Sequence, residues 1–372
     1  MFKIWFVKKI SPLIYLLILG FLGALFYTQP LLLIVKDFTH VIKPILGISI
    51  GYLFFKVIND FRLFSKIIIY CGLASAIIHI LILFFVADLF SGSISAIRYY
   101  TKDNFLELFS LVLLIYYKRF EGVRLLKSIF FHRITIIVLG FSAFMYFSRT
   151  MIVVAIIMLL TIYGFTALTR KSLRYVAVII TAILLFYAYL YSVKIERDGP
   201  GLQGFFYKVK MAPAELFTTK IDRNDHADLW DHWRGYETKR ALALMDKNPP
   251  SIIFGNGLGS TVNLKFYAPL DDTPGSKGLR YISELHNGYI YVLYKFGVIG
   301  LAIYVILLLK WYHIINKRKD LIAILISAIA LIYIFTTLTI TGLYNSRDIF
   351  IFLLGALFHF NYIYDKKLLP KN

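Results

Sequence analysis

The sequence predicts an all-α integral membrane protein with about ten transmembrane helices, and three observations support this fold class. Hydrophobic residues make up 59% of the chain and charged residues only 17%, whereas soluble domains carry about 25% charged residues. Apolar runs close to the roughly 20 residues that cross a bilayer as a helix recur along the chain. The 27 Tyr and 33 Phe suit a chain that anchors many helix ends at two membrane interfaces.

Ten runs are apolar enough to be membrane helices, the fourth and fifth being short. They are roughly 11–28, 40–57, 66–88, 104–117, 131–147, 150–168, 175–194, 297–315, 321–341 and 348–364. With a cytoplasmic amino terminus, the inner connections and the two ends hold 21 Lys and Arg residues, and the short outer connections hold six. The positive-inside rule therefore predicts that both termini are cytoplasmic. The net charge of +20 is then an orientation signal, and a nucleic-acid partner is not expected.

The start of the chain and its cysteine have simple interpretations. The basic segment 1–10 precedes a long apolar run without a small-residue cleavage site, so we expect an uncleaved first membrane helix. Cys71 is the only cysteine and lies within an apolar run. It predicts neither a disulfide nor a thiolate metal cluster, and no metal or other cofactor is expected.

One segment, 195–284, interrupts the succession of apolar runs. It lies between the seventh and eighth predicted membrane helices, and its Lys and Arg nearly balance its Asp and Glu. A loop of this length can be translocated to the outer side regardless of its charge. We expect a lid with short helices, one of them spanning 228–247, resting on a single membrane domain that comprises the rest of residues 1–372.

The polar-to-apolar stretch that follows this loop contains His286. A single span beginning at Leu285 would bury the ammonium of Lys295 near mid-membrane, which is costly. A span beginning at Gly297 avoids this cost, so residues 282–296 are expected to form a short interfacial or re-entrant helix hinged at Gly297. Its predicted face comprises His286, Tyr289, Ile290 and Leu293. From the residues alone, His286 is either structural or catalytic.

Three further features lie on the predicted outer side. Arg149 sits in the tight turn Phe147-Ser-Arg-Thr150, as either an interface anchor or an anion site. Arg234 begins a basic helical stretch that is either a solvated face or a ligand surface. The glycines of Phe254-Gly-Asn-Gly-Leu-Gly259 resemble a phosphate loop, but no Lys-Ser/Thr follows them. A tight backbone turn is the better interpretation.

Together these motifs resemble the O-antigen ligase and polymerase superfamily, over about residues 92–310. The resemblance rests on His286-Asn followed by ten residues to Gly297, on Ser148-Arg149 opening an outer-side helix, and on Arg234 about fifteen residues before Asn248-Pro. Two departures affect the alignment of Arg234. Thr238 stands where the family often has a tryptophan, and extra residues lengthen the step from Asn248-Pro to the glycine-rich turn.

The resemblance implies a GT-C-like membrane glycosyltransferase of the bacterial inner membrane that uses an undecaprenyl-diphosphate-linked glycan on the periplasmic face without a metal. In this mechanism Arg149 and Arg234 would stabilise the diphosphate leaving group. His286 would be the general base that accepts the proton of the attacking sugar hydroxyl. Further substrate contacts are expected from Arg280, Arg98, Tyr289 and Trp233.

The preferred function is polymerisation of O-antigen or related repeat units. A close alternative is a ligase that transfers the finished glycan to lipid A-core, and a more distant one is a lipid-glycan flippase. A flippase should show polar residues or Gly/Pro breaks in matched halves near mid-membrane, whereas the polar residues here gather at the predicted outer face. Membrane lipid is an expected partner, and partners could include a chain-length regulator.

Overall fold

The structure is a computed structural model, and it describes residues 3–87, 100, 101, 103–197, 203–217, 222, 226–269, 277–345 and 348–368. The chain divides into two compact units, which are described separately. Unit 1 comprises Met1–Ser49, Met211–Lys310 and Tyr333–Asp348. Unit 2 comprises Ile50–Lys210, Trp311–Ile332 and Ile349–Asn372.

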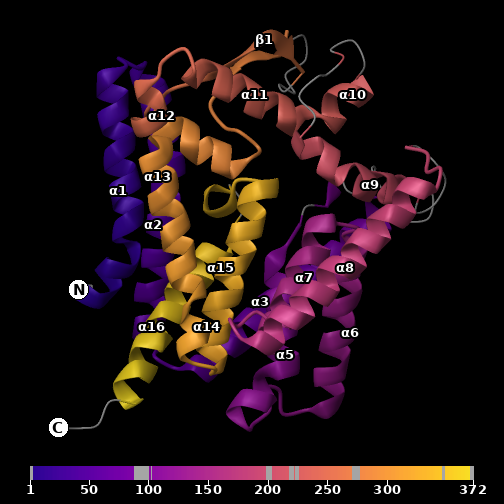
Figure 1. The fold of residues 1–372 in the computed structure, drawn as a ribbon. Helices are drawn as coiled ribbons and strands as arrows, with labels where there is room; N and C mark the ends of the chain where they lie inside the picture. Colours follow the sequence, from indigo (N-terminus) through magenta and orange to yellow (C-terminus); the bar gives the residue numbers. More distant parts are fainter. Residues whose placement is uncertain are drawn as a thin grey trace. The chain divides into compact units, whose positions relative to one another are not determined.

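Each of the ten predicted membrane runs overlaps a long helix (Figure 1). These helices are α1 (Ile4–Phe26), α2 (Leu31–Ile58), α3 (Phe61–Phe85), α5 (Phe105–Glu121), α6 (Ile129–Met145), α7 (Arg149–Ile162), α8 (Arg170–Ser192), α13 (Gly288–Tyr312), α15 (Leu321–Thr339) and α16 (Phe350–Leu368). Within the described residues, six segments are long and apolar enough to cross a membrane: α1, α2, α3, α8, Gly288–Lys317 and α15. Helices α6 and α7 are shorter apolar helices. The protein is therefore a multi-pass membrane protein.

Short polar side chains set the starts of several helices in unit 2. An N-cap side chain accepts a hydrogen bond from a backbone N–H that has no partner within the helix. Such caps are Asp60 on α3, Asn104 on α5, Ser128 on α6, Ser148 on α7 and Thr169 on α8. Helix α5 ends at Gly122 with a φ of 73°, a conformation that favours glycine. The caps explain why connections of a few residues suffice between apolar helices.

A buried carboxylate joins α3, α5 and α6 within unit 2. Glu107 accepts hydrogen bonds from Ser75 at 3.1 Å, from Ser142 at 2.5 Å and from Tyr146 at 2.8 Å. A charged group within a helical membrane bundle is costly unless it is paired or hydrogen-bonded. Three hydroxyl donors from two neighbouring helices satisfy this carboxylate and fix the packing of the three helices.

In its described residues, the segment predicted to be a lid contains four helices and, unexpectedly, two strands. Its elements are α9 (Gln203–Phe217), α10 (His226–Asp231), α11 (Trp233–Met245), α12 (Pro250–Phe254), β1 (Val262–Ala268) and β2 (Leu279–Ile282). The strands pair antiparallel, with Val262 opposite Ile282. The prediction of a single helix within 228–247 is wrong in detail, since a break at His232 separates α10 from α11. Trp233, the first residue of α11, lies in a ring cluster with Tyr236 and Phe266.

The hinge predicted at Gly297 is present. Helix α13 is kinked there, with a φ of 66° and a ψ of −171° at Gly297 inside otherwise helical backbone. A Cβ at this position would lie 2.2 Å from the carbonyl oxygen of Ile253, so only glycine fits. Residues 288–296 therefore form a separate half-helix in front of the longer apolar helix 298–312.

Candidate functional site

His286 lies between β2 and α13. The side chain of Asn287 accepts hydrogen bonds from the backbone N–H groups of Tyr289 at 3.1 Å and Ile290 at 3.3 Å, and so caps α13. The helix therefore begins at Gly288. The prediction that His286 lies on the helix face is wrong, because the Asn287 cap starts the helix at Gly288, two residues after the histidine. His286 sits at the entrance of the half-helix instead.

The carboxylate of Glu237, on α11, holds His286 in place. The backbone N–H of His286 donates to Glu237 Oε2 at 2.9 Å. The imidazole Nδ1 lies 3.1 Å from Oε1 and 3.2 Å from Oε2 of the same carboxylate. The Glu237 side chain is 2% exposed and that of His286 is 52% exposed. A buried acid thus fixes both the backbone and the ring of a solvent-accessible histidine.

This contact determines which ring nitrogen can accept a proton. A carboxylate has no hydrogen to donate, so Nδ1 carries the hydrogen that joins the two groups. In the neutral ring, Nε2 is then the acceptor. The carboxylate would also stabilise the imidazolium that forms after proton uptake. The pair has the geometry of a general base with an orienting acid.

Arg234 lies one turn from Glu237 on α11. Residues three apart on a helix have Cβ atoms about 5–6 Å apart, so the Arg234 side chain leaves α11 next to that of Glu237. Arg234 forms an ion pair with Glu215 of α9, and both side chains are mostly covered. To bind a diphosphate, Arg234 would have to exchange or share this partner.

A glycine-rich turn fixes the other end of the half-helix. The backbone N–H of Asn256 donates to the carbonyl of Tyr294 at 2.8 Å, and that of Gly257 donates to the carbonyl of Lys295 at 2.9 Å. Leu258 N–H donates at 2.9 Å to the carbonyl of Gly20 in α1. The first two bonds satisfy carbonyls that the kink at Gly297 leaves without helical donors. The prediction of a tight turn rather than a phosphate loop is confirmed, because protein acceptors already occupy its N–H groups.

Close packing explains the glycines of this turn. Gly257 has a φ of 77°, and a Cβ there would lie 2.1 Å from the backbone nitrogen of Ala24. A Cβ on Gly23 of α1 would lie 2.7 Å from the Cα of Gly257. The two backbones therefore touch, and neither position has room for a side chain. This contact fastens the turn, and through it the half-helix, to α1.

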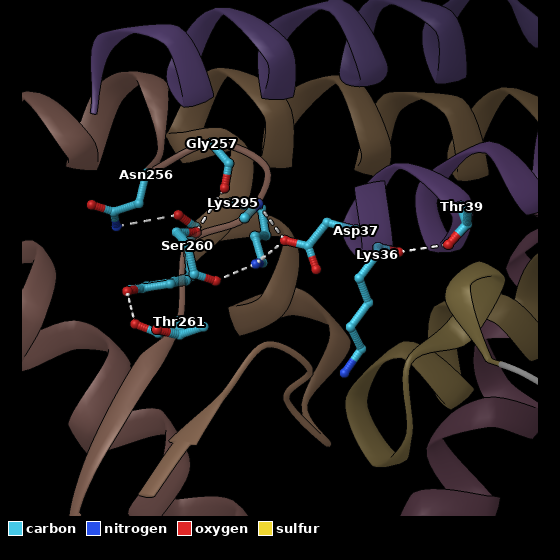
Figure 2. A network of polar contacts seen from close by, with 10 residues as sticks. Lys36, Asp37, Thr39, Asn256, Gly257, Ser260, Thr261 and Lys295 are labelled. Carbon is cyan, nitrogen blue, oxygen red and sulfur yellow. Dashed lines mark hydrogen bonds and ion pairs between the residues drawn. The ribbon is translucent and has the colours of Figure 1, made fainter. Parts of the chain in front are cut away.

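A buried ion pair completes this anchor, as Figure 2 shows. The ammonium of Lys295 lies 2.5 Å from Asp37 Oδ2 on α2 and donates to the carbonyl of Ser260 at 2.5 Å. Gly259 N–H also donates to Asp37 Oδ2, at 2.6 Å. The side chains of Lys295 and Asp37 are 0% and 2% exposed. Lys295 was expected to avoid burial in the apolar region, whereas the structure buries it with a counter-ion.

Removing either partner of this pair is expected to destabilise the protein by about 3–5 kcal/mol, because the other charge is left buried and unpaired. The double variant Asp37→Leu with Lys295→Met should lose much less than the sum of the single variants Asp37→Leu and Lys295→Met. Thermal unfolding of the detergent-solubilised chain measures this. Lys36→Met is the matched control, since Lys36 is exposed and points away from the pair in Figure 2. Additive losses in the double variant would contradict the pairing.

The remaining predicted substrate residues differ in accessibility. Arg280 is exposed on β2, with its guanidinium 5.9 Å from the ring centre of Tyr281. The hydroxyl of Tyr289 donates a hydrogen bond to the carbonyl of Ile334 at 2.8 Å, so this hydroxyl already has a partner within the protein. Trp233 is only 3% exposed, whereas Trp230 beside it is 42% exposed. The exposed Trp230 is thus better placed than Trp233 to stack on a sugar.

Arg149 belongs to unit 2, where it is the first residue of α7. Its guanidinium donates to the carbonyl of Lys208 in α9. The preceding Ser148 donates to Asp103 at 2.8 Å, which ties the turn to the start of α5. That Arg149 converges with His286 stays a prediction, because the two residues lie in different units. Arg98 lies outside the described residues.

Sequence reasoning missed two functional candidates, Glu237 and Asp37. Glu237 is one of several charges in the polar stretch around Arg234, and only its 1% exposure distinguishes it. Asp37 follows Lys36 in the connection before the second predicted membrane run, so its neighbours do not indicate a buried partner. That partner, Lys295, lies 258 residues further along the chain.

The fold and the site define a multi-pass membrane protein with an acid-supported histidine beside an arginine-bearing helix. Residues 134–305 match the family model described as O-antigen ligase. The resemblance seen in the sequence is therefore confirmed over this matched domain. The matched range includes Arg149, Arg234, His286 and Gly297. No curated protein and no solved structure matches the chain.

Proposed function

We propose that the protein is a membrane glycosyltransferase that polymerises undecaprenyl-diphosphate-linked repeat units of a surface polysaccharide on the periplasmic face. The observation that carries the proposal is the His286–Glu237 pair, a half-exposed imidazole oriented by a buried carboxylate. The family match supports a glycan-transferring enzyme with a lipid-linked glycan as substrate. The periplasmic location follows from the predicted orientation of the chain.

The proposed reaction is a single displacement at the anomeric carbon. A hydroxyl oxygen of the acceptor sugar forms a bond to that carbon, while the bond from the carbon to the diphosphate oxygen breaks. The hydroxyl proton passes to His286 Nε2, and the bonding electrons leave with the diphosphate. A positioned imidazole contributes about 10²–10⁴-fold to such a transfer, and arginines stabilise the charge that develops on the leaving group.

Arg234 and Arg149 are the arginines proposed to stabilise the diphosphate leaving group, and different observations support each of them. Arg234 lies one helical turn from Glu237, so the lid helix links it to the base. Arg149 is held at the start of a membrane helix by the Ser148 cap and by its own bond to Lys208. Arg280 and Trp230 are the proposed glycan contacts, since both are exposed within the lid.

The glycans of a strain that lacks the protein test this proposal. A lost polymerase should leave single repeats on lipid A-core, because the ligation step still operates. A lost ligase should instead leave uncapped core and full-length polymer on its lipid carrier. That result would favour the alternative function, a ligase, over the polymerase. Unchanged polysaccharide in the deletion strain would exclude both enzymes.

A further inference from the structure

Unit 2 contains a cavity of about 550 Å³ that the proposed reaction does not use. It lies where three connections meet: the end of α5, the turn between α7 and α8, and the segment between α14 (Ile314–Lys317) and α15. All three belong to unit 2. The positive-inside rule predicts each of them on the cytoplasmic side. The volume is in the range of about 300–1,000 Å³ that is usual for small-molecule sites.

Cations line the polar part of this cavity. Arg119, Lys171 and Lys319 contribute to its wall and are exposed. Among the described residues that line the cavity, none is acidic, and no ion pair is found for these three cations. The nearest acidic groups in the sequence are Glu121 and Asp320, and Asp320 pairs with Arg318. Three cations without an ion pair around one opening attract an anion.

Most of the rest of the wall is apolar or aromatic, with the hydroxyl residues Thr169 and Ser172 beside it. Ile162, Phe165, Ile315 and Ile324 line it together with Tyr163. The guanidinium of Arg119 lies 5.2 Å from the ring centre of Tyr163, so the cationic and apolar parts meet there. A small hydrated anion would use only the cations. A molecule with a charged head and an apolar chain would use both parts.

Local hydrogen bonds preform the cavity. Tyr312 donates to the carbonyl of Thr166 at 2.5 Å, and the backbone N–H of Leu168 donates to Asn316 Oδ1 at 2.8 Å. Thr169 caps α8 by accepting from Ser172 N–H at 3.1 Å. The start of this 23-residue helix therefore lies at the cavity, and its N-terminal dipole adds to the attraction for an anion. The loop 163–169 thus has fixed partners without a ligand.

We propose that this cavity binds the phosphate headgroup of an anionic phospholipid from the adjacent leaflet. Arg119, Lys171 and Lys319 contact the phosphate oxygens, and the isoleucines and aromatic rings contact the glycerol and the first acyl carbons. Basic pockets between membrane helices on the cytoplasmic side are suited to this chemistry. The proposal does not depend on the glycosyltransferase assignment.

Titration of the detergent-solubilised full chain with phosphatidylglycerol, followed by native mass spectrometry, tests the proposal. Phosphatidylglycerol should bind more tightly than phosphatidylcholine of the same chain length. Each of the variants Arg119→Gln, Lys171→Gln and Lys319→Gln should weaken binding about fivefold, the effect of one cation near a lipid surface, and the triple variant on the order of 100-fold. The triple variant Lys66→Gln, Lys127→Gln, Arg133→Gln removes equal charge from unit 2 away from the cavity and should bind normally.

Three outcomes would overturn the proposal. The first is equal affinity for phosphatidylcholine, and the second is equal weakening by the control triple variant. The third is competition by inorganic phosphate at the same concentration as the lipid, which would indicate a free-anion site. Circular dichroism checks that the variants remain folded. If the triple variant does not fold, the loss of phosphatidylglycerol affinity in each single variant tests the proposal instead, and unchanged affinity in all three would overturn it.

Discussion

Replacing His286 with alanine is expected to lower the rate of glycan transfer by about 10²–10⁴-fold, the usual contribution of a positioned general base. The loss should appear in turnover rather than in the KM for the lipid-linked acceptor, since the imidazole acts on a proton that moves only in the reaction. The measurement is polymer formation by purified protein with lipid-linked repeat units. Chain length of the polysaccharide in complemented cells provides a second readout.

Chemical rescue separates a catalytic from a structural role for this histidine. The His286 side chain is 52% exposed, so the space left by His286→Gly is open to solvent. Added imidazole should restore part of the turnover of His286→Gly and should not change the activity of the wild-type protein. Full activity of His286→Ala, at normal protein levels, would end the general-base proposal.

Glu237→Gln is expected to reduce turnover nearly as strongly as loss of the base. Replacing the carboxylate of a Ser-His-Asp triad by an amide costs about 10⁴-fold, because the amide favours the wrong tautomer and gives the imidazolium no counter-charge. Gln keeps the size of Glu237 and can still accept from the backbone N–H of His286, so the fold should persist. KM for the acceptor should change little, and Glu237→Asp should retain more activity than Glu237→Gln.

The matched control for this variant is Asp246→Asn, at the exposed C-cap of the same helix. It removes one negative charge from α11 without touching His286. Normal turnover in Glu237→Gln would show that the carboxylate does not orient the base. Equal losses in Glu237→Gln and Asp246→Asn would show a general effect of lid charge.

The sequence predicted the helices well because hydropathy is a local property. Each apolar run became a helix, and the hinge predicted at Gly297 is present, although Lys295 is buried with a counter-ion rather than kept out of the apolar region. The exact first residue of α13 could not be predicted from hydropathy, because the Asn287 cap determines where the helix starts. The β-hairpin was missed, although Val262 and Leu264 are both buried, as alternation would predict. Its second strand has only four residues and gains its conformation by pairing.

The candidate site could be predicted only in part, for a similar physical reason. His286 and Arg234 belong to motifs that are contiguous in sequence. Glu237 acquires its role through a contact across 49 residues, and Asp37 through one across 258 residues. Nothing in their immediate neighbours specifies those contacts. Both residues became visible once burial identified them as acids that need a partner.

The anchored half-helix also constrains the length of the chain between His286 and Gly297. Its first turn is fixed by the Asn287 cap and by the bond from Gly288 N–H to the carbonyl of Ile340, and its last turn by the glycine-rich turn. One inserted residue would rotate one end against the other by about 100° and lengthen the helix by about 1.5 Å. Either His286 would leave Glu237 or Lys295 would leave Asp37. The ten residues between His286 and Gly297 therefore have a fixed number, because that number sets the position of the histidine. Their identity matters less for this purpose.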